Sequence, residues 1–342
     1  MPSKKYKAAI VGCGRVASLF ANDRKRKGIF THAQAYLAHP KVELIAACDT
    51  NPSRLSAFGK RWGVKRLYTD FTKLMREEKP DLVSICTWNS SHEPLLRTAV
   101  KYGASGVICE KPISDSLRSA QKMIRLCKAK RLPLLINYYR RYNKLHQKLK
   151  TMIQNGSLGE IQTVSCYYTS GIMNTGTHLF DLLRYFFGDV RWVWANPDRV
   201  LQAKDPTLDL YLFFKMGFGC SISALDVKKY MQFEIDIYGT RGRLRLEDSG
   251  MKATIWRKEE HTVYSGYKTL QRDRAFQTKL TNFSLATVNN LIACVEEKKK
   301  PICSGEDGKK SLEIACAGHM SLKQNRRVYL PLKNSDLRLE SN

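Results

Sequence analysis

The sequence lacks the features that mark several large classes of protein. It holds 10 cysteines, but no two form a C-x-x-C pair, so neither a zinc site nor a disulfide framework is indicated. No stretch approaches the roughly 20 consecutive apolar residues that a membrane-spanning helix needs. We therefore expect no metal site, no membrane span and a reducing compartment, the cytoplasm.

Acidic residues are scarce relative to basic ones. Asp and Glu number 31 against 58 Lys and Arg, which leaves a net charge of +27, with +16 on residues 1–137 and +11 on the remainder. The electric field of this excess positive charge attracts anions: nucleic acid, an acidic membrane surface, or a phosphorylated or carboxylated small molecule. A compositional bias with solvated lysines explains the charge equally well. The sequence has no helix-turn-helix signal and no RNA-binding aromatic motif, so we expect no nucleic-acid partner.

A chain of 342 residues favours two domains. Over the first part of this chain, short apolar runs alternate with segments of helix length. The runs are Lys7–Val11, Val42–Cys48, Leu82–Thr87, Val107–Cys109 and Leu132–Asn137. This alternation is typical of βαβ units around a buried parallel sheet. Helices are predicted from Ser53, as N-cap, to Arg61 and over Ser116–Lys130. We predict that residues 1–137 form a doubly wound parallel α/β domain.

The pattern changes after about residue 140. Strands with period-two alternation are predicted at Ile161–Tyr168, Leu208–Phe214, Gly219–Ala224, Phe233–Tyr238 and Gly242–Leu246, and helices at Thr177–Phe187, Leu280–Glu297 and Lys309–Gln324. Residues 138–342 are therefore predicted to form an α+β domain with a mainly antiparallel sheet.

A glycine-rich turn follows the first predicted strand. Gly12 and Gly14 begin a G-x-G-x-x-A motif that closes with Ala17, and a helix is predicted after it. In this arrangement the glycines allow a tight turn and a close approach of the pyrophosphate of a dinucleotide. Asp49, at the end of the second strand, is suited to bind ribose hydroxyls and to repel a 2′-phosphate, which favours NAD. Arg54 lies close by in sequence and keeps NADP as the alternative.

Two further segments carry candidate catalytic groups. Glu110, Lys111 and Pro112 follow the fourth apolar run, at the carboxyl end of a parallel strand, where ligands bind in open α/β sheets. Downstream, Asn174, His178 and Asp181 have the spacing i, i+4, i+7 and share one face if the helix begins early enough. A histidine can exchange a hydroxyl proton at neutral pH, although the apolar neighbours of His178 fit a buried structural histidine as well.

Together these motifs resemble the glucose–fructose oxidoreductase, inositol dehydrogenase and MocA family over nearly the whole chain. The resemblance includes His32, the segment from Asn89 to His92, the segment Tyr138–Tyr142, and a late segment from Lys300 to Leu332. It implies a Rossmann domain that carries NAD or NADP, and a second domain whose open sheet binds substrate and mediates a homodimer or homotetramer.

The resemblance also implies roles for individual residues. Lys111 is expected beside the nicotinamide and the reacting hydroxyl, with His178 as acid/base. The family motif begins with Asp where this chain has Asn174, which can orient a hydroxyl but cannot accept its proton. Predicted cofactor contacts come from Gly12, Gly14, Arg15, Val16, Asp49, Thr87, Asn89, His92, Glu110 and Lys111, and predicted substrate contacts from Arg141, Asn174 and Asp181.

The expected activity is hydride transfer between a hydroxyl-bearing carbon of a sugar or cyclitol and C4 of a nicotinamide. An Asn at position 174 also resembles the subset that acts on nucleotide-linked sugars, and an anionic substrate of that kind suits the basic charge. Two alternatives stay open. One is an NAD-dependent glycosidase that acts by transient oxidation and elimination, and the other is a non-catalytic NAD(P)-binding regulator.

Overall fold

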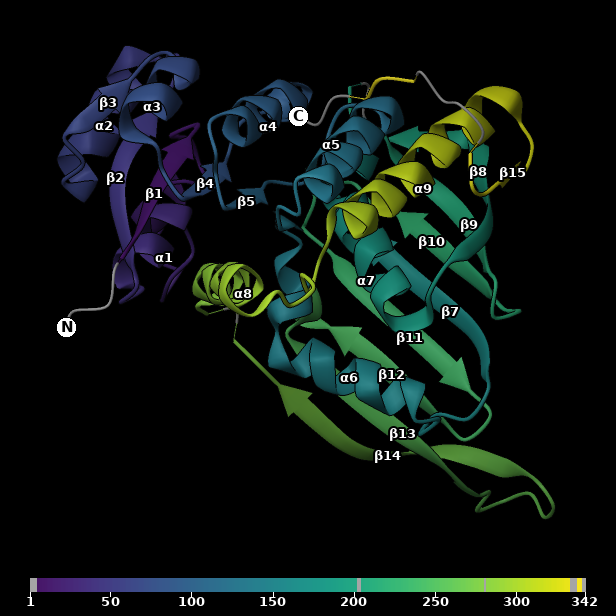
Figure 1. Cartoon of the computed structure of the whole chain (residues 1–342). Helices are drawn as coiled ribbons and strands as arrows, with labels where there is room; N and C mark the ends of the chain where they lie inside the picture. Colours follow the sequence, from purple (N-terminus) through teal and green to yellow (C-terminus); the bar gives the residue numbers. More distant parts are fainter. Residues whose placement is uncertain (1–4, 202–203, 280, 333–336, 340–342) are drawn as a thin grey trace. The chain divides into compact units, whose positions relative to one another are not determined.

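The computed structural model describes residues 5–201, 204–279, 281–332 and 337–339. These residues fold into two units (Figure 1). The first contains residues 5–142, 281–309 and 337–339, and the second contains the described parts of 143–279 and 310–332. This division differs from a single boundary at residue 137, because residues 281–309 belong to the first unit.

The first unit is built on a parallel sheet. Among the described residues it has six strands in the order β3-β2-β1-β4-β5-β6, and every neighbouring pair is parallel. The strands are β1 (Tyr6–Val11), β2 (Val42–Cys48), β3 (Arg66–Tyr68), β4 (Leu82–Ile85), β5 (Gly106–Cys109) and β6 (Leu134–Ile136). Strands β4 and β5 are wholly buried, as expected for strands covered on both faces. The predicted doubly wound α/β fold is confirmed.

The helices of this unit are α1 (His32–Ala38), α2 (Pro52–Trp62), α3 (Phe71–Glu78), α4 (His92–Lys101), α5 (Leu117–Ala129) and α8 (Phe283–Glu297). Helix α2 begins one residue before the predicted cap, because Asn51 accepts the Arg54 N–H and Pro52 occupies the first turn. Ser116 caps α5 by accepting the Ser119 N–H. Residue 280, in the predicted helix 280–297, lies outside the described residues.

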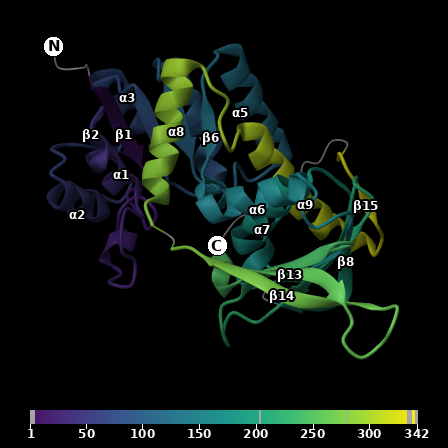
Figure 2. The same ribbon diagram turned by 90° about the horizontal axis from the view of Figure 1, so that it is seen from below.

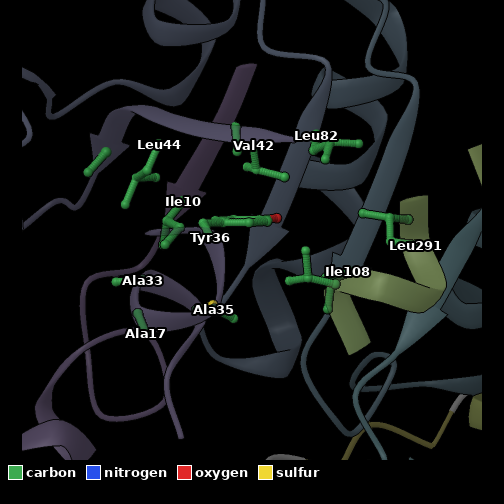
Figure 3. Close-up of a cluster of buried hydrophobic side chains, with 14 of the residues drawn as sticks. Ile10, Ala17, Ala33, Ala35, Tyr36, Val42, Leu44, Leu82, Ile108 and Leu291 are labelled. Carbon is green, nitrogen blue, oxygen red and sulfur yellow. The ribbon is translucent and has the colours of Figure 1, made fainter. Parts of the chain in front are cut away.

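Helix α8 completes the core of the first unit although it comes late in the chain. Leu291 of α8 lies in the same buried cluster as Ile10, Tyr36 and Ile108 (Figure 3). A Cβ on Gly106 of β5 would lie 2.9 Å from a methyl carbon of Leu291, so the strand and the helix are in close contact. Residues 281–309 therefore pack as part of the parallel-sheet unit.

The second unit contains a mixed, mainly antiparallel sheet, as predicted. Its described strands number nine, in the order β14-β13-β12-β11-β7-β10-β9-β8-β15, and only the β7–β10 pair is parallel. They are β7 (Ile161–Tyr168), β8 (Val190–Leu201), β9 (Thr207–Phe214), β10 (Gly219–Ala224), β11 (Phe233–Gly239), β12 (Gly242–Glu247), β13 (Lys252–Glu260), β14 (Lys268–Gln277) and β15 (Val328–Tyr329). Helices α6 (Lys144–Gln154), α7 (Thr177–Phe187) and the part of α9 (Gly305–Gln324) in this unit cover one face of the sheet (Figure 2).

All ten cysteines are buried and none is in a disulfide. None of the helices in the described ranges combines the length and the apolar character needed to cross a membrane.

Candidate functional site

The glycine turn follows β1. Its first glycine, Gly12, is closely packed, whereas its second, Gly14, faces open space. Gly12 has φ +88°, and a Cβ there would lie 2.8 Å from the Cys86 carbonyl and from Cγ2 of Thr87. Only glycine fits this position. A Cβ on Gly14 would meet nothing within 4 Å. The packing therefore requires Gly12, while Gly14 presents bare backbone to open space.

The predicted helix after this turn is reduced to short turns. Ser18 N–H donates to the Gly14 carbonyl at 3.0 Å, a 3-10 helix covers Leu19–Asn22, and the first α-helix begins only at His32. Within the described part of the chain, the N–H groups of residues 15–17 donate to no protein acceptor. Successive backbone N–H groups of this kind form a concave site for an anion. The open face at Gly14 and these donors fit the pyrophosphate of a dinucleotide.

Asp49 connects the end of β2 to the glycine turn. Its carboxylate is 5% exposed, with Oδ2 accepting the Cys13 N–H and Oδ1 accepting the Asn51 N–H, both at 2.8 Å. The guanidinium of Arg54 lies 3.5 Å from Oδ2. The acidic residue and the basic residue from which the cofactor preference was predicted therefore lie side by side.

The loop after β4 contains three predicted cofactor contacts. Thr87 lies against Gly12. Asn89 is buried, and its Nδ2 donates to the Leu339 carbonyl at 2.9 Å. His92 is fully buried with its ring nitrogens 3.1 Å and 3.2 Å from the carbonyls of Thr87 and Ile113, and burial lowers the pKa of this imidazole. These hydrogen bonds of Asn89 and His92 hold the loop in place, and cofactor contacts from the two residues stay a prediction.

Glu110 and Lys111 follow β5 directly. The Glu110 N–H donates to the Ile85 carbonyl at 2.9 Å, which continues the β4–β5 ladder to the last residue before the turn. Glu110 is 6% exposed, Lys111 is half-buried, and the peptide bond between Lys111 and Pro112 is cis. The backbone immediately before Lys111 is therefore fixed by this β4–β5 hydrogen bond, at the carboxyl end of the sheet.

Beneath Lys111 the structure shows a buried polar cluster that the sequence did not reveal. Oε1 of Glu110 lies 2.9 Å from Nε2 of His32 and accepts a hydrogen bond from Nδ2 of Asn137 at 2.6 Å. Burial by itself raises the pKa of Glu110, but the hydrogen bonds from His32 and Asn137 and the charges of His32 and Lys111 hold it below its usual value. The sequence could have indicated this cluster, because Ser84, His32 and Asn137 are polar residues within or beside apolar runs.

In the second unit, Asn174 and His178 lie on either side of a junction between two kinds of helix. Residues Gly171–Gly176 form a π-helix and α7 begins at Thr177. Asp205, which the sequence did not single out, accepts the N–H groups of Met173 and Asn174 at 2.8 Å and 2.9 Å. This carboxylate therefore anchors the turn that carries Asn174 and leads into His178, which is 9% exposed.

Asp181 and Arg141, two of the residues predicted to contact the substrate, form hydrogen bonds with other residues of their own units. Asp181 is 1% exposed, and Oγ of Ser311 donates to it at 3.4 Å. In the first unit, the buried guanidinium of Arg141 donates to the Ile302 carbonyl at 3.1 Å and to Asp307 at 3.2 Å. These contacts tie α7 to α9 and the segment after β6 to the 302–307 segment. No group of His, Cys, Asp and Glu within the described ranges has the arrangement of a metal site.

Comparisons with known proteins agree with this geometry. Residues 6–138 match a family model described as an oxidoreductase family with an NAD-binding Rossmann fold, and residues 168–330 match that of an oxidoreductase family C-terminal alpha/beta domain. The chain is 25% identical to a D-apiose dehydrogenase of Paraburkholderia graminis, over 96% of this chain and 90% of that protein. It is 24% identical to a myo-inositol 2-dehydrogenase of Thermotoga maritima, over 94% and 97%. The crystal structure of the WlbA dehydrogenase from Bordetella pertussis, in complex with NADH and UDP-GlcNAcA, superposes with a TM-score of 0.77 at 22% identity, covering 96% of this chain and 100% of that one.

Proposed function

The chain belongs to the glucose–fructose oxidoreductase, inositol dehydrogenase and MocA family, and we propose that within it the protein is an NAD-dependent dehydrogenase of a sugar or cyclitol. The observation that carries this proposal is the glycine turn. Its bare backbone at Gly14 and the donors of residues 15–17 suit a pyrophosphate, and the carboxylate of Asp49, bound to the Cys13 N–H, is suited to ribose hydroxyls. When bound, NAD+ supplies the hydride acceptor, C4 of its nicotinamide.

Lys111 and His178 are proposed as the catalytic groups. The ammonium of Lys111 is suited to hold and polarise the oxygen of the substrate hydroxyl, which makes its proton easier to remove. A ring nitrogen of His178 is suited to take that proton. Asn174 provides an amide that orients a hydroxyl without titrating. The two catalytic residues belong to different units, so support for each comes from its own surroundings and from the family resemblance.

The substrate class follows from the relatives and from charge. The relatives named above act, by their names, on D-apiose and myo-inositol, a sugar and a cyclitol that each carry several hydroxyls. A net charge of +27 suits a substrate that carries phosphate or carboxylate. We therefore propose a sugar or cyclitol hydroxyl as the reacting group, with nucleotide-linked sugars as the anionic members of the test panel. Assembly as a homodimer or homotetramer is part of this proposal.

The test is turnover measured as NADH formation. The purified protein would be mixed with NAD+ and, in separate reactions, D-apiose, myo-inositol, a methyl glucoside and a UDP-linked uronic acid. We expect NADH with at least one of them and saturable NAD+ binding by calorimetry. Binding without NADH, but with release of a coloured aglycone from a nitrophenyl glycoside, would favour the glycosidase alternative. Absence of NAD+ binding in protein shown to contain no trapped cofactor would contradict the proposal.

A further inference from the structure

A continuous set of buried polar side chains leads from Glu110 through the first unit. We name it the His32 network, and its members are Tyr36, Ser84, His32, Glu110, Asn137 and Thr287. None is more than 6% exposed. They come from α1, from β4, from the residues that follow β5 and β6, and from α8. Segments that lie far apart in sequence therefore meet at one buried point beside the strand end that carries Lys111.

The contacts of the network have hydrogen-bonding distances throughout. In order they are Tyr36 Oη to Ser84 Oγ (2.7 Å), Ser84 Oγ to His32 Nδ1 (2.9 Å), His32 Nε2 to Glu110 Oε1 (2.9 Å), Asn137 Nδ2 to Glu110 Oε1 (2.6 Å), and Thr287 Oγ1 to Asn137 Oδ1 (3.2 Å). The second oxygen of Glu110 faces the N–H of Lys111 at 3.3 Å. Both carboxylate oxygens are thus engaged, and one of them faces the backbone of the candidate catalytic lysine.

Such an arrangement restricts how the strand end can move. A buried carboxylate is stable only while its partners stay in place, because an unpaired charge in the interior costs several kcal/mol. Glu110 is therefore held in one conformation by His32 and Asn137. Because Lys111 is the next residue and its N–H meets the same carboxylate, the direction in which Lys111 leaves the sheet depends on these contacts.

Among the described residues, the hydrogen bonds of the network do not reach solvent at either end of the chain of contacts. Its two ends are the Tyr36 hydroxyl and the Thr287 hydroxyl, which belong to residues that are 0% and 1% exposed. A proton relay needs an end that exchanges with water, and neither end of these contacts reaches the surface. The network therefore suits a fixed support better than a path for protons.

We propose that His32 is a positioning residue for Lys111: its Nε2–H fixes the Glu110 carboxylate, and the carboxylate fixes the turn that carries Lys111. This inference rests on the proposed function, because it takes Lys111 as the group that meets the substrate hydroxyl. His32 contacts no reacting atom in this scheme, and its effect passes through Glu110.

Two substitutions at one position separate this role from simple packing. In His32→Gln the amide nitrogen can take the place of Nε2 and still donate to Glu110. In His32→Asn the shorter amide can replace only Nδ1, so the contact with Ser84 is kept and the contact with Glu110 is lost. Both variants lose the imidazole ring. Tyr36→Phe is the matched control, since it removes one hydrogen bond from the same network without touching Glu110.

The readouts are the chemical reactivity of Lys111 and the kinetics. Competitive acetylation with acetic anhydride, quantified by mass spectrometry against exposed Lys60 of the same sample, reports the surroundings of Lys111 without any substrate. We expect His32→Asn to change this rate by about threefold or more and to lower kcat about tenfold, with the KM for NAD+ within about twofold of wild type. His32→Gln should bring both the acetylation rate of Lys111 and kcat most of the way back to their wild-type values, and Tyr36→Phe should acetylate like wild type.

Wild-type acetylation of Lys111 in His32→Asn would overturn the proposal, and so would equal changes in His32→Asn and His32→Gln. If His32→Asn does not fold, Glu110→Gln examines the same link, and unchanged acetylation of Lys111 there would also overturn it. Failure of the wild-type protein to oxidise any sugar would instead count against the proposed function. The acetylation result does not depend on turnover, so the two failures are distinguishable.

Discussion

Asp49 at the end of β2 accepts the backbone N–H of Cys13, 36 positions earlier, through the same oxygen that lies 3.5 Å from the guanidinium of Arg54. The first contact ties the glycine turn to β2. The second brings opposite charges to the place where the adenosine ribose of a dinucleotide binds in this fold. The carboxylate favours the hydroxyls of NAD+, whereas the guanidinium favours the 2′-phosphate of NADP+.

Substitution of Asp49 is therefore expected to change the cofactor preference. Asp49→Asn keeps one oxygen for the Cys13 N–H but removes the negative charge, which leaves Arg54 unopposed. The ratio of the Kd for NADP+ to the Kd for NAD+ should fall about tenfold, which corresponds to ~1.4 kcal/mol. Calorimetric titration with each cofactor measures this ratio. Arg54→Ala is the control and should move the ratio in the opposite direction, so a common shift in both variants would contradict this account.

Lys111→Met is expected to abolish turnover while the Kd for NAD+ stays within about threefold of wild type. The substitution keeps most of the length of the side chain and removes the ammonium that we propose polarises the substrate oxygen, while the glycine turn and Asp49 are untouched. NADH formation and calorimetric binding measure the two effects. Lys128→Met, which removes an exposed lysine of α5, should retain both. Full turnover in Lys111→Met would remove Lys111 from the catalytic assignment.

Asp205→Ala is expected to lower kcat and to destabilise the second unit by about 1–3 kcal/mol, because the buried N–H of Met173 and the partly buried N–H of Asn174 lose their acceptor. The turn that carries Asn174 and leads into His178 would lose its anchor. Asp205→Asn keeps one acceptor oxygen and should fall between wild type and Asp205→Ala. Urea unfolding and steady-state kinetics measure the effects. Asp198→Ala, at an exposed position of β8, is the control, and a loss of the same size there would show that the anchor has no special role.

His319 on α9 should make the protein less stable in mild acid. Burial lowers the pKa of this imidazole to about 4, and its buried Nε2 contacts no hydrogen-bonding partner among the described residues. The unfolded chain, with a histidine pKa of about 6.5, takes up a proton before the folded protein does. The free energy of unfolding therefore keeps its full value above about pH 6.5. It decreases as the pH falls toward 4, by up to about 1.4 kcal/mol per pH unit. Urea unfolding at several pH values should show a shallower slope for His319→Gln, and an unchanged slope would exclude His319 as the cause.

Local patterns were sufficient to predict the parallel-sheet unit and the glycine turn. Val42–Cys48 is apolar and β-branched enough to identify β2 to the residue, and the glycine spacing located the turn. Local patterns failed where structure depends on distant partners. Helix α8 shows an ordinary helical pattern, and nothing in that pattern indicates that Leu291 packs on β5. The contact between His32 and Glu110 joins positions 78 apart, which no periodicity reveals.

The second unit illustrates a different limit. Strand β14 was missed because most of its side chains are exposed, so it has no alternation of apolar and polar residues. The π-helix before α7 depends on Asp205 and Thr207, which accept the N–H groups at its start. Short-range spacing predicted a shared face for Asn174, His178 and Asp181 if the helix began early enough, but it carried no signal for the π-helix that precedes Thr177.

The return of α8 to the first unit has a consequence for synthesis on the ribosome. The parallel sheet is complete after β6, but Leu291 and Thr287 reach it only after about half of the chain has followed. Until then Gly106 faces an open groove and Asn137 lacks its partner from α8. The first unit therefore gains the last helix of its core only after the segment that follows β14 has emerged from the ribosome.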